Sequence, residues 1–395
     1  MKKVAIITLV LDNYGTKLQS YALCKVLNNI CSNDLNVEVV NLERTWGGKG
    51  STRSKKQLII DVFKHYGSSI PMRLWEIFLW EVQKKKYYQN QDTPEIRQRT
   101  QNFKRINSQI PYTDKKYTFD EIRNGELPEY DGYIVGSDQV WNGIKVGNQD
   151  VFMLDFVKKG KCLTYAASFG MTHIPDMMMI DYQRRIKNFE SLLIREEEGV
   201  RLCEKLGCEN VHQVLDPTLL LDKHGYEEII YSKPVVEGDF VLVYSLNNSL
   251  KIHNEAYKLA KTTHSKLVIL KTKPCPPNIS VYNDCIEIYT AASEEFLWLI
   301  SHAKCVITNS YHAMLFSINY GTDFYLYLDN ADEENSRMLS TANLCGLKDR
   351  VYWMTDSLPN EIIEIDYTQT NEILLKEREK SINLLKESLI SSNLI

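Results

Sequence analysis

Short apolar runs alternate with segments of helical periodicity along most of the chain. Apolar runs predict β-strands at 4–10, 37–41, 132–135, 162–166, 192–195 and 211–215, and helical periods lie between them, as at 16–28 and 196–206. Strand–turn–helix repeats of this kind predict parallel β-α-β units.

The alternation stops near 222–238, where glycine and proline replace the apolar period, and then restarts. Strands are predicted at 240–244, 266–270, 286–288, 305–308 and 324–328, and helices at 250–262, 294–301, 313–320 and 370–393. We therefore expect an α/β fold with two Rossmann-like domains, at 1–225 and 238–366, followed by a C-terminal helix at 367–395. Such folds bind ligands in the cleft at the carboxyl ends of their strands.

A helical insertion interrupts the first domain at about 54–107. It carries an aromatic run that includes Trp75, Phe78 and Trp80, and a basic run, 84–86, follows it. An aromatic face that ends in lysines suits a membrane interface. A core helix with a solvated basic end is the alternative, because periodicity alone cannot separate the two.

Composition narrows the function classes. The chain has 395 residues and a formal net charge of -4, so the global basic field of a nucleic-acid-binding protein is absent. Its nine cysteines are scattered and include no C-x-x-C pair, the spacing typical of zinc sites. We therefore expect no metal site. The first apolar run ends too early for a signal peptide, and no window is apolar enough to span a membrane. We expect a cytoplasmic protein.

The turn after the first strand is the first candidate binding element. Asn13, Tyr14 and Gly15 precede the helix at 16–28. Glycine lets the backbone approach a ligand closely, and a helix start offers free N–H groups. An ordinary turn capped by Asn13 is the alternative.

A second polar cluster follows the strand at 132–135. Ser137, Asp138, Gln139 and Asn142 come together with Trp141 at the carboxyl end of that strand. Amides and carboxylates bind sugar hydroxyls, and an indole covers the ring face, so this cluster predicts a sugar-binding wall. The alternative is that Ser137 or Asp138 caps a helix.

Two arginines are candidates for holding an anion. Arg195 ends an apolar strand where a helix begins, and its guanidinium can fork onto a carboxylate or phosphate. A salt bridge to Glu196 or Glu197 is the alternative. Arg337 could add charge at the cleft, or it could lie on a solvated helix start.

The stretch 305–314 holds the sharpest catalytic candidate. A buried strand leads through Asn309 and Ser310 into a helix whose first turn contains His312. Ser310 is a good N-cap, and the free N–H groups of a helix start can seat an anion. A histidine at that position can contact the anion and move a proton.

Taken together, these stretches resemble the polysaccharide pyruvyl transferase family. The matching segments run in family order over roughly 4–350, and they are 13–23, 136–142, 165–170, 191–196, 216–218 and 308–312. The resemblance implies two Rossmann-like domains of glycosyltransferase B type, with the acceptor on the N-terminal domain and the donor on the C-terminal domain. A basic residue that some relatives carry just before the histidine is absent, because Ser310 and Tyr311 stand there.

The resemblance also implies a reaction, in which pyruvate moves from phosphoenolpyruvate onto two hydroxyls of a sugar and forms a ketal. Phosphoenolpyruvate is then a co-substrate and no cofactor is needed, while the acceptor is a sugar or a lipid-linked oligosaccharide met at the inner face of the membrane. The alternatives are a nucleotide-sugar-dependent glycosyltransferase and a non-catalytic carbohydrate-binding relative.

Site roles follow from the same resemblance. Arg195 and His312 match family positions tied to phosphoenolpyruvate binding and catalysis. We expect His312 to be an acid/base group or a phosphate contact, and Asp138 to be the base for an acceptor hydroxyl. The remaining candidates are Arg195, Arg337, Ser310 and Asn309 for the donor, and Asn13, Tyr14, Gly15, Gln139, Trp141 and Asn142 for the acceptor.

Overall fold

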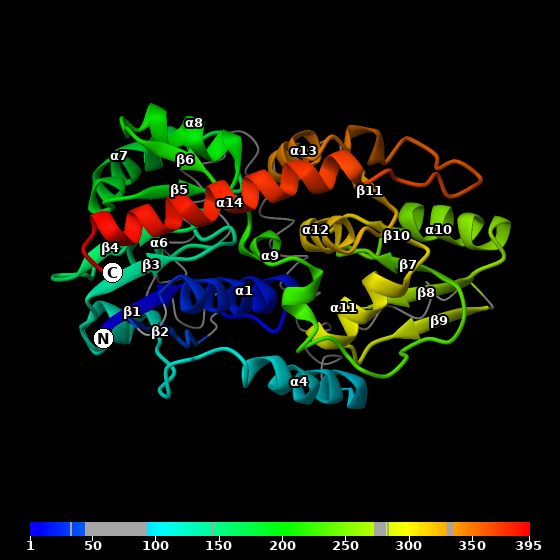
Figure 1. The fold of residues 1–395 in the computed structure, drawn as a ribbon, viewed down its shortest axis with the longest axis horizontal. Coiled ribbons are helices and arrows are strands. Elements are labelled where there is room, and N and C mark those ends of the chain that lie inside the picture. The colour runs from blue at the N-terminus through cyan, green and yellow to red at the C-terminus, as the bar shows by residue number, and fades with distance from the viewer. Residues whose placement is uncertain (32–33, 44–92, 144–145, 272–281, 283, 330–334) are drawn as a thin grey trace, which may run out of the picture.

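Two parallel β-sheets with flanking helices lie side by side in the computed structural model (Figure 1). The structure describes residues 1–31, 34–43, 93–143, 146–271, 282, 284–329 and 335–395. The two termini lie close together at the outer end of the N-terminal domain, where the Lys2 ammonium donates to the carbonyl of Asn393.

The N-terminal sheet has the order β2-β1-β3-β4, and the pair β5-β6 continues it through isolated bridges from Leu163 to Ser191 and from Ala167 to Ile194. All of these pairings are parallel. The strands are β1 (Lys2–Ile7), β2 (Leu35–Val39), β3 (Gly132–Val135), β4 (Lys161–Thr164), β5 (Leu192–Ile194) and β6 (Val211–Gln213). The helices are α1 (Tyr14–Cys31), α4 (Pro94–Asn107), α5 (Phe119–Arg123), α6 (Gln149–Phe152), α7 (Asp176–Arg185), α8 (Glu197–Lys205) and α9 (Pro217–Leu220).

The C-terminal sheet is also wholly parallel and has the order β12-β11-β10-β7-β8-β9. Its strands are β7 (Phe240–Tyr244), β8 (Lys266–Leu270), β9 (Cys285–Ile288), β10 (Cys305–Thr308), β11 (Phe324–Leu328) and β12 (Val351–Trp353). The helices are α10 (Leu250–Thr262), α11 (Ser293–His302), α12 (Tyr311–Tyr320), α13 (Asn335–Leu344) and α14 (Thr368–Ser391). Short 3-10 turns lie at Ile186–Asn188, Lys223–Tyr226 and Lys348–Arg350.

The central strands are buried on both faces, which is why they read as continuous apolar runs in the sequence. Every residue of β3, β7, β10 and β11 is buried. Strands covered by helices on both sides need apolar side chains at every position rather than at alternate ones. The expected α/β fold class with two Rossmann-like units is confirmed, because each of the two sheets is parallel and is flanked by helices.

Aromatic packing joins the domains at the start of α1. The ring of Tyr14 stacks on Phe296 of α11, with centroids 4.5 Å apart and planes 7° from parallel. Its hydroxyl donates to the carbonyl of Ala291 at 3.2 Å. Tyr14 is 1% exposed. This corrects the expectation that Tyr14 binds an acceptor, because its ring and its hydroxyl are both used in the contact between domains.

The long helix α14 crosses from the C-terminal domain back to the N-terminal domain (Figure 1). Ser381 of α14 accepts a hydrogen bond from the backbone N–H of Leu215 at 3.0 Å, and Arg378 donates to the carbonyl of Leu219 at 2.6 Å. Helix α14 therefore supports the segment 215–219 through these two hydrogen bonds.

The predicted helical insertion is described only in part. Helix α4 lies inside it, begins at a Thr93 cap and runs Pro94–Asn107. Trp75, Phe78, Trp80 and the lysine run 84–86 lie outside the described residues. In the part of the chain that is described, no helix combines the length and the apolar character that crossing a bilayer requires.

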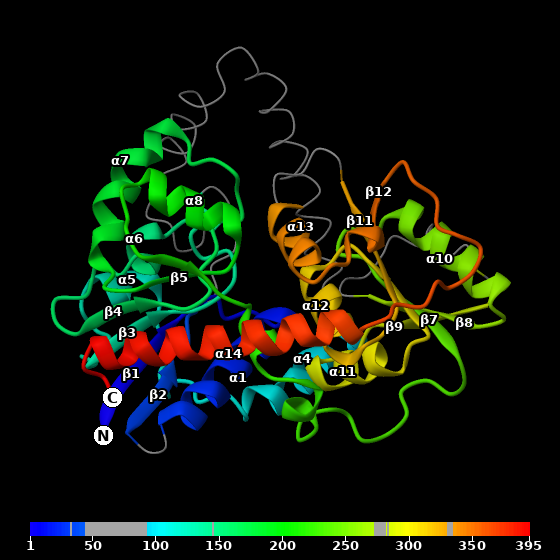
Figure 2. The same cartoon turned by 45° about the horizontal axis from the view of Figure 1, so that its top comes forward.

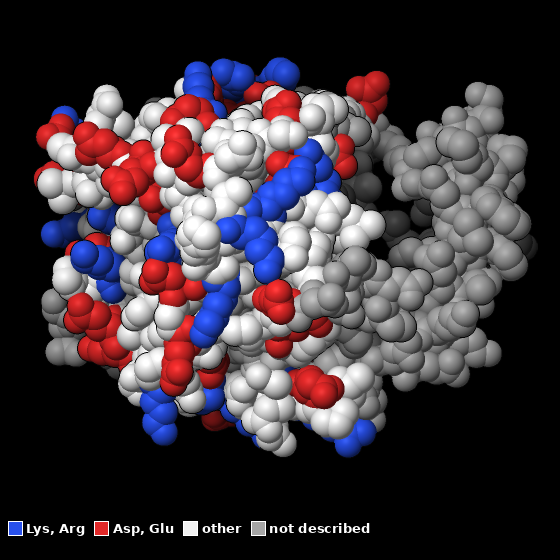
Figure 3. All heavy atoms as spheres, turned by 90° about the vertical axis from the view of Figure 1, so that its right-hand side faces the viewer, with Lys and Arg blue, Asp and Glu red and all other residues white. Residues whose placement is uncertain are grey.

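Basic and acidic side chains are mixed on the outer end of the C-terminal domain (Figure 3). Ion pairs account for several of the lysines. Lys258 lies 3.0 Å from Glu255, Lys261 lies 3.1 Å from Asp284, and Lys304 lies 2.7 Å from Asp239. The charges on this face therefore largely neutralise one another locally.

A buried histidine in α10 predicts a dependence of stability on pH. His253 is 1% exposed, and among the described residues neither of its ring nitrogens has a hydrogen-bond partner. Burial, reinforced by the Lys271 ammonium and partly opposed by Glu287, lowers the pKa of His253 to about 4. The unfolded chain therefore binds a proton at about pH 6.5 that the folded chain does not bind until about pH 4.

The free energy of unfolding is therefore expected to fall as pH drops through this window, by up to about 1.4 kcal/mol per pH unit from this group. Urea titrations at pH 7 and pH 5 check this. The His253→Leu variant should lose about 1–2 kcal/mol less than wild type between the two pH values. Equal losses in both proteins would show that His253 does not titrate on unfolding.

Candidate functional site

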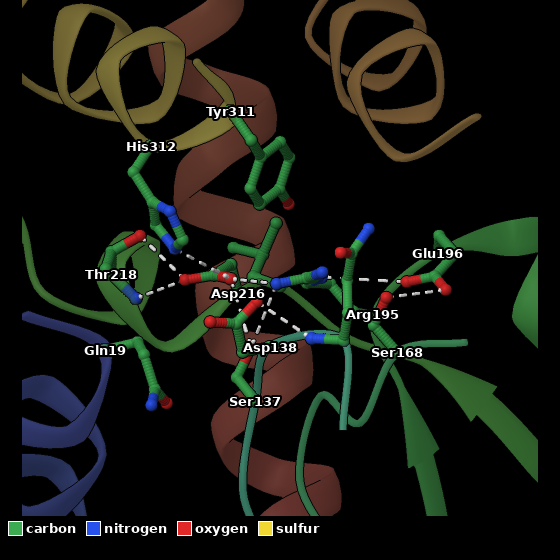
Figure 4. A network of polar contacts seen from close by, with 12 residues as sticks. Gln19, Ser137, Asp138, Ser168, Arg195, Glu196, Asp216, Thr218, Tyr311 and His312 are labelled. Carbon is green, nitrogen blue, oxygen red and sulfur yellow. Dashed lines mark hydrogen bonds and ion pairs between the residues drawn. The ribbon is translucent and has the colours of Figure 1, made fainter. Parts of the chain in front are cut away.

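The carboxyl ends of strands from both domains meet in one polar cluster (Figure 4). The N-terminal domain contributes the segment after β3, the residue after β5 and the segment before α9. The C-terminal domain contributes the first turn of α12, directly after β10. Parallel strands place their carboxyl ends on one edge, so distant stretches of sequence converge here.

Asp216 lies at the centre of the cluster and is 1% exposed. Its Oδ2 accepts hydrogen bonds from the Ser137 hydroxyl and from Nη1 of Arg195, each at 3.1 Å. Its Oδ1 accepts from the backbone N–H of Thr218 at 3.0 Å and from the Thr218 hydroxyl at 2.8 Å. Burial opposes ionisation, but His312, Arg195 and the Thr218 donors outweigh it and hold the pKa of Asp216 below its usual value. Asp216 is thus a fixed buried anion.

Arg195 pairs with two carboxylates and still keeps N–H groups for a ligand. Its Nη1 contacts Asp216, its Nε lies 3.6 Å from Oε2 of Glu196, and its guanidinium carbon lies 4.8 Å from the ring centre of Tyr311. Burial lowers the pKa of Arg195, but Tyr311 and the two carboxylates outweigh that effect and raise it overall. Arg195 therefore combines the predicted salt bridge with the geometry of an anion clamp.

Glu196 is itself held by backbone donors. Its Oε1 accepts from the Ser168 hydroxyl at 2.9 Å and from the N–H groups of Phe169 and Gly170 at 3.0 and 3.3 Å. This fixes the carboxylate beside Arg195, so the arginine is positioned from two sides.

His312 faces the cluster from the first turn of α12. Its Nε2 lies 3.9 Å from Oδ2 of Asp216, which is an electrostatic contact rather than a hydrogen bond. Gly15 packs against its ring, since a Cβ added at Gly15 would fall 2.0 Å from Nδ1. Gly15 therefore permits the close approach of α1 to the histidine, which places this predicted residue at the site.

Burial lowers the pKa of His312, and the charges of Asp216 and Asp138 only partly offset that effect. The imidazole is therefore neutral at pH 7. A neutral imidazole can accept a proton or donate one hydrogen bond, and a bound anion would favour its charged form.

Arg337 of α13 brings a second guanidinium to the cluster. Its guanidinium carbon lies 5.4 Å from the centre of the Tyr311 ring, which Arg195 also contacts. Burial and the nearby Arg195 charge lower the pKa of Arg337. The Asp138 and Glu196 carboxylates offset this effect only in part, so a bound anion would further stabilise the two guanidiniums.

Unused donors in this cluster converge from both domains. Four side-chain nitrogens have no hydrogen-bond partner in the described part of the chain, namely Nε and Nη2 of Arg195, Nε of Arg337 and Nε2 of His312. Buried donors without partners are costly, so such a set indicates a place for an anionic ligand. Within the same described residues, no group of three or more histidine, cysteine or acidic side chains is placed to hold a metal ion.

Asp138 occupies a strained turn beside these donors. Its φ of 83° is left-handed, an uncommon conformation for a residue other than glycine. Its Oδ1 accepts from the N–H of Gln139 at 2.8 Å and its Oδ2 accepts from the Thr16 hydroxyl at 3.2 Å. Figure 4 shows the Asp138 carboxylate next to Asp216 and Arg195. Asp138 is half-buried.

Trp141 and Asn142 do not form a sugar-binding wall, which corrects that expectation. Trp141 is 0% exposed, its Nε1 donates to the carbonyl of Phe152 at 2.9 Å, and its ring packs against Phe169. Asn142 is 3% exposed and donates to the carbonyl of Gly170 at 3.2 Å. Both side chains hold the fold beneath the site.

Three other predicted residues shape the loops around the cluster. Ser310 caps α12 by accepting from the N–H of Ala313 at 3.4 Å. Asn309 accepts from the N–H of Leu246 at 2.8 Å, and Asn13 accepts from the N–H of Gly15 at 3.0 Å. Gln139 is half-buried beside Gly170, and its Nε2 has no partner among the residues described. It remains a candidate ligand contact.

Asp216 and Glu196 were missing from the predicted site residues. Asp216 follows β6 and precedes Pro217, a pattern typical of a helix cap, and it does accept from the N–H of Thr218 as a cap would. The same carboxylate also faces Arg195. The family resemblance at 216–218 pointed to this segment, but the contact of Asp216 with Arg195 follows from the meeting of β3, β5 and α9 in three dimensions.

Comparison with known proteins identifies a family. The family model described as polysaccharide pyruvyl transferase matches residues 13–331. No curated protein sequence matches the chain significantly. Similar solved structures include two UDP-GlcNAc 2-epimerases. The one from Methanocaldococcus jannaschii has a TM-score of 0.49 at 12% identity and covers 96% of this chain and 93% of its own. The one from Rickettsia bellii has a TM-score of 0.49 at 9% identity, with coverages of 100% and 96%.

Proposed function

Since the chain belongs to the polysaccharide pyruvyl transferase family, we propose that it transfers pyruvate from phosphoenolpyruvate to a sugar. The acceptor is a sugar of a surface or capsular polysaccharide precursor, and two of its hydroxyls become a cyclic pyruvate ketal. Phosphoenolpyruvate serves as the co-substrate.

The convergent unpartnered nitrogens of Arg195, Arg337 and His312 carry this proposal. Phosphoenolpyruvate holds a phosphate and a carboxylate a few bonds apart. Guanidiniums recognise both groups through charge-assisted hydrogen bonds. One arginine for each anionic group, with a histidine beside them, matches the charge of this donor.

The reaction balances with acid and base groups alone. A proton adds to the methylene carbon of phosphoenolpyruvate, and the adjacent carbon becomes cation-like. The first sugar hydroxyl attacks that carbon and gives up its proton. The C–O bond to phosphate then breaks, inorganic phosphate leaves with the bonding pair, and the second hydroxyl closes the ketal with loss of its proton.

Three residues of this chain fit those proton movements. Asp138 accepts the proton of the attacking hydroxyl, because it is only half-buried and lies at the turn after β3. His312 exchanges a proton with the donor, since bound phosphate and carboxylate favour the imidazolium. Asp216 acts as a positioning residue because it pairs with Arg195 and lies near Nε2 of His312.

Donor choice is tested by thermal stabilisation. Phosphoenolpyruvate at 100 times its Kd should stabilise the protein by about 2.7 kcal/mol, whereas UDP-sugars at the same concentration should not. Mass spectrometry of nitrophenyl and lipid-linked sugars incubated with phosphoenolpyruvate should then show the gain of one pyruvate less one water. Stabilisation by a nucleotide sugar alone would favour a glycosyltransferase. Sugar binding without turnover of either donor would favour a non-catalytic relative.

A further inference from the structure

A cavity opens between the two domains, beside the polar cluster of the candidate site. That cluster is called the anion-binding cluster below, and its central residues are Arg195, Asp216, His312 and Arg337. It holds about 470 Å³ and lies between the start of α8 and one ridge of α13, next to β12. Sites for small molecules occupy about 300–1,000 Å³. Helices α8 and α13 contact each other and face one another across the domain boundary in Figure 2.

Both walls of the cavity continue directly from the anion-binding cluster. On α8, Glu197 and Glu198 follow Glu196 in the chain. On α13, Ser336 and Ser340 lie on either side of Arg337. A ligand in the cavity is therefore next to the residues that would hold the donor.

Gln213 bridges the cavity and the cluster. Its Nε2 donates to the Ser340 hydroxyl at 3.2 Å and to the carbonyl of Arg195 at 3.3 Å. One side chain thus links the cavity wall to the backbone of the arginine that would clamp the donor. A molecule that spans the two places would put one end near Arg195 and the other in the cavity.

The lining suits a neutral polyhydroxy ring better than an anion. Trp353 is partly buried and offers an aromatic face, while Ser340 and Asn343 offer hydroxyl and amide groups. The carboxylates of Glu197 and Glu198 line the opposite wall, where Arg201 pairs with both at 2.6 and 3.0 Å. Lys348 also lines the cavity, so this lysine and Arg201 together balance the two carboxylates, and no net charge favours an anion. The carboxylates can accept hydrogen bonds from sugar hydroxyls.

We propose that this cavity binds a neutral sugar unit of the acceptor saccharide, stacked on Trp353 and bonded through Asn343. The assignment of this sugar to the acceptor rests on the proposed function, but the binding of a sugar here does not. The cavity would select acceptors that are at least a disaccharide, with the reacting sugar placed near Asp138.

Direct binding tests the proposal without any turnover. Saturation-transfer NMR with neutral methyl hexosides and disaccharides should detect binding to wild type. Loss of the indole stack or of the amide hydrogen bond should weaken this binding about tenfold. Trp353→Ala removes the stack. Asn343→Arg fills the cavity from an exposed position, so it should leave the fold intact. Asn124→Ala, at an exposed asparagine after α5, is the control.

The results separate this proposal from the proposed function. Weaker sugar binding in Asn343→Arg, with stabilisation by phosphoenolpyruvate unchanged, supports both. Weaker sugar binding in a protein that phosphoenolpyruvate fails to stabilise supports the cavity and defeats the donor assignment. Wild type that binds none of these sugars, or a folded Asn343→Arg variant that binds them as wild type does, overturns the cavity as a sugar site.

Discussion

Replacement of His312 by alanine is expected to lower turnover by about 10²–10⁴-fold, the range for a lost acid–base group. The chain should stay folded, because His312 is not fully buried and 14% of its side chain is exposed. Its Nε2 has no hydrogen-bond partner to lose within the described residues. Steady-state turnover with phosphoenolpyruvate and an identified acceptor sugar is the measurement, with circular dichroism to verify folding.

Two matched variants test whether His312 transfers a proton or only fills space at the site. His312→Gln keeps a hydrogen-bonding side chain but cannot exchange a proton near neutral pH, so it should remain as slow as alanine. Gly15→Ala keeps the imidazole but forces it to move, since the added Cβ would overlap the ring, and it should also be slow. A folded His312→Ala variant with nearly wild-type turnover would exclude His312 from the chemistry.

The pH dependence of kcat/KM provides a second, independent test of the role of His312. Burial lowers the pKa of His312 below its usual 6.5, so the imidazole is neutral in the free enzyme at pH 7 and becomes charged only on further acidification. The profile of kcat/KM should therefore show a titration below pH 6.5. That titration should be absent from the His312→Gln variant. A titration that persists there belongs to another group.

The fold was largely predictable because the sheet strands are buried on both faces. Runs such as 240–244 and 324–328 contain only aliphatic and aromatic side chains, and both coincide with strands of the structure. Strand β12 was not predicted, because Val351–Trp353 is short and only partly buried at a sheet edge. Helix α9 was not predicted either, because its four residues are too few to show a helical period.

The candidate site was only partly predictable, because local sequence does not record which direction a side chain takes. Arg195, His312 and Asp138 were found, since each follows a strand and carries a chemically useful group. Trp141 and Tyr14 also follow a strand in the sequence. However, Trp141 is 0% exposed and packs into the core, and Tyr14 is 1% exposed and packs into the contact between the domains. Burial on folding decided between those roles.

Replacement of Arg195 by lysine is expected to weaken phosphoenolpyruvate binding by about 10–100-fold, which corresponds to one lost charge-assisted hydrogen bond. The guanidinium reaches Asp216 with Nη1 while Nε and Nη2 have no hydrogen-bond partner among the residues described. A lysine ammonium is a single point of charge. It can pair with the buried carboxylate or reach the donor, but it cannot repeat the planar fork that does both.

The choice of lysine rather than alanine keeps the experiment interpretable. Alanine would leave Asp216 buried beside one fewer cation, and breaking a buried pair costs about 3–5 kcal/mol of stability. Arg201→Lys is the matched control, because Arg201 follows on α8, is 55% exposed and pairs only with surface carboxylates in the described structure. Its phosphoenolpyruvate affinity should equal that of wild type. If the folded Arg195→Lys variant also binds phosphoenolpyruvate like wild type, then Arg195 serves only as the ion-pair partner of Asp216 and Glu196. Arg337 and His312 would in that case be the remaining groups of this cluster that could bind the phosphate and carboxylate of phosphoenolpyruvate.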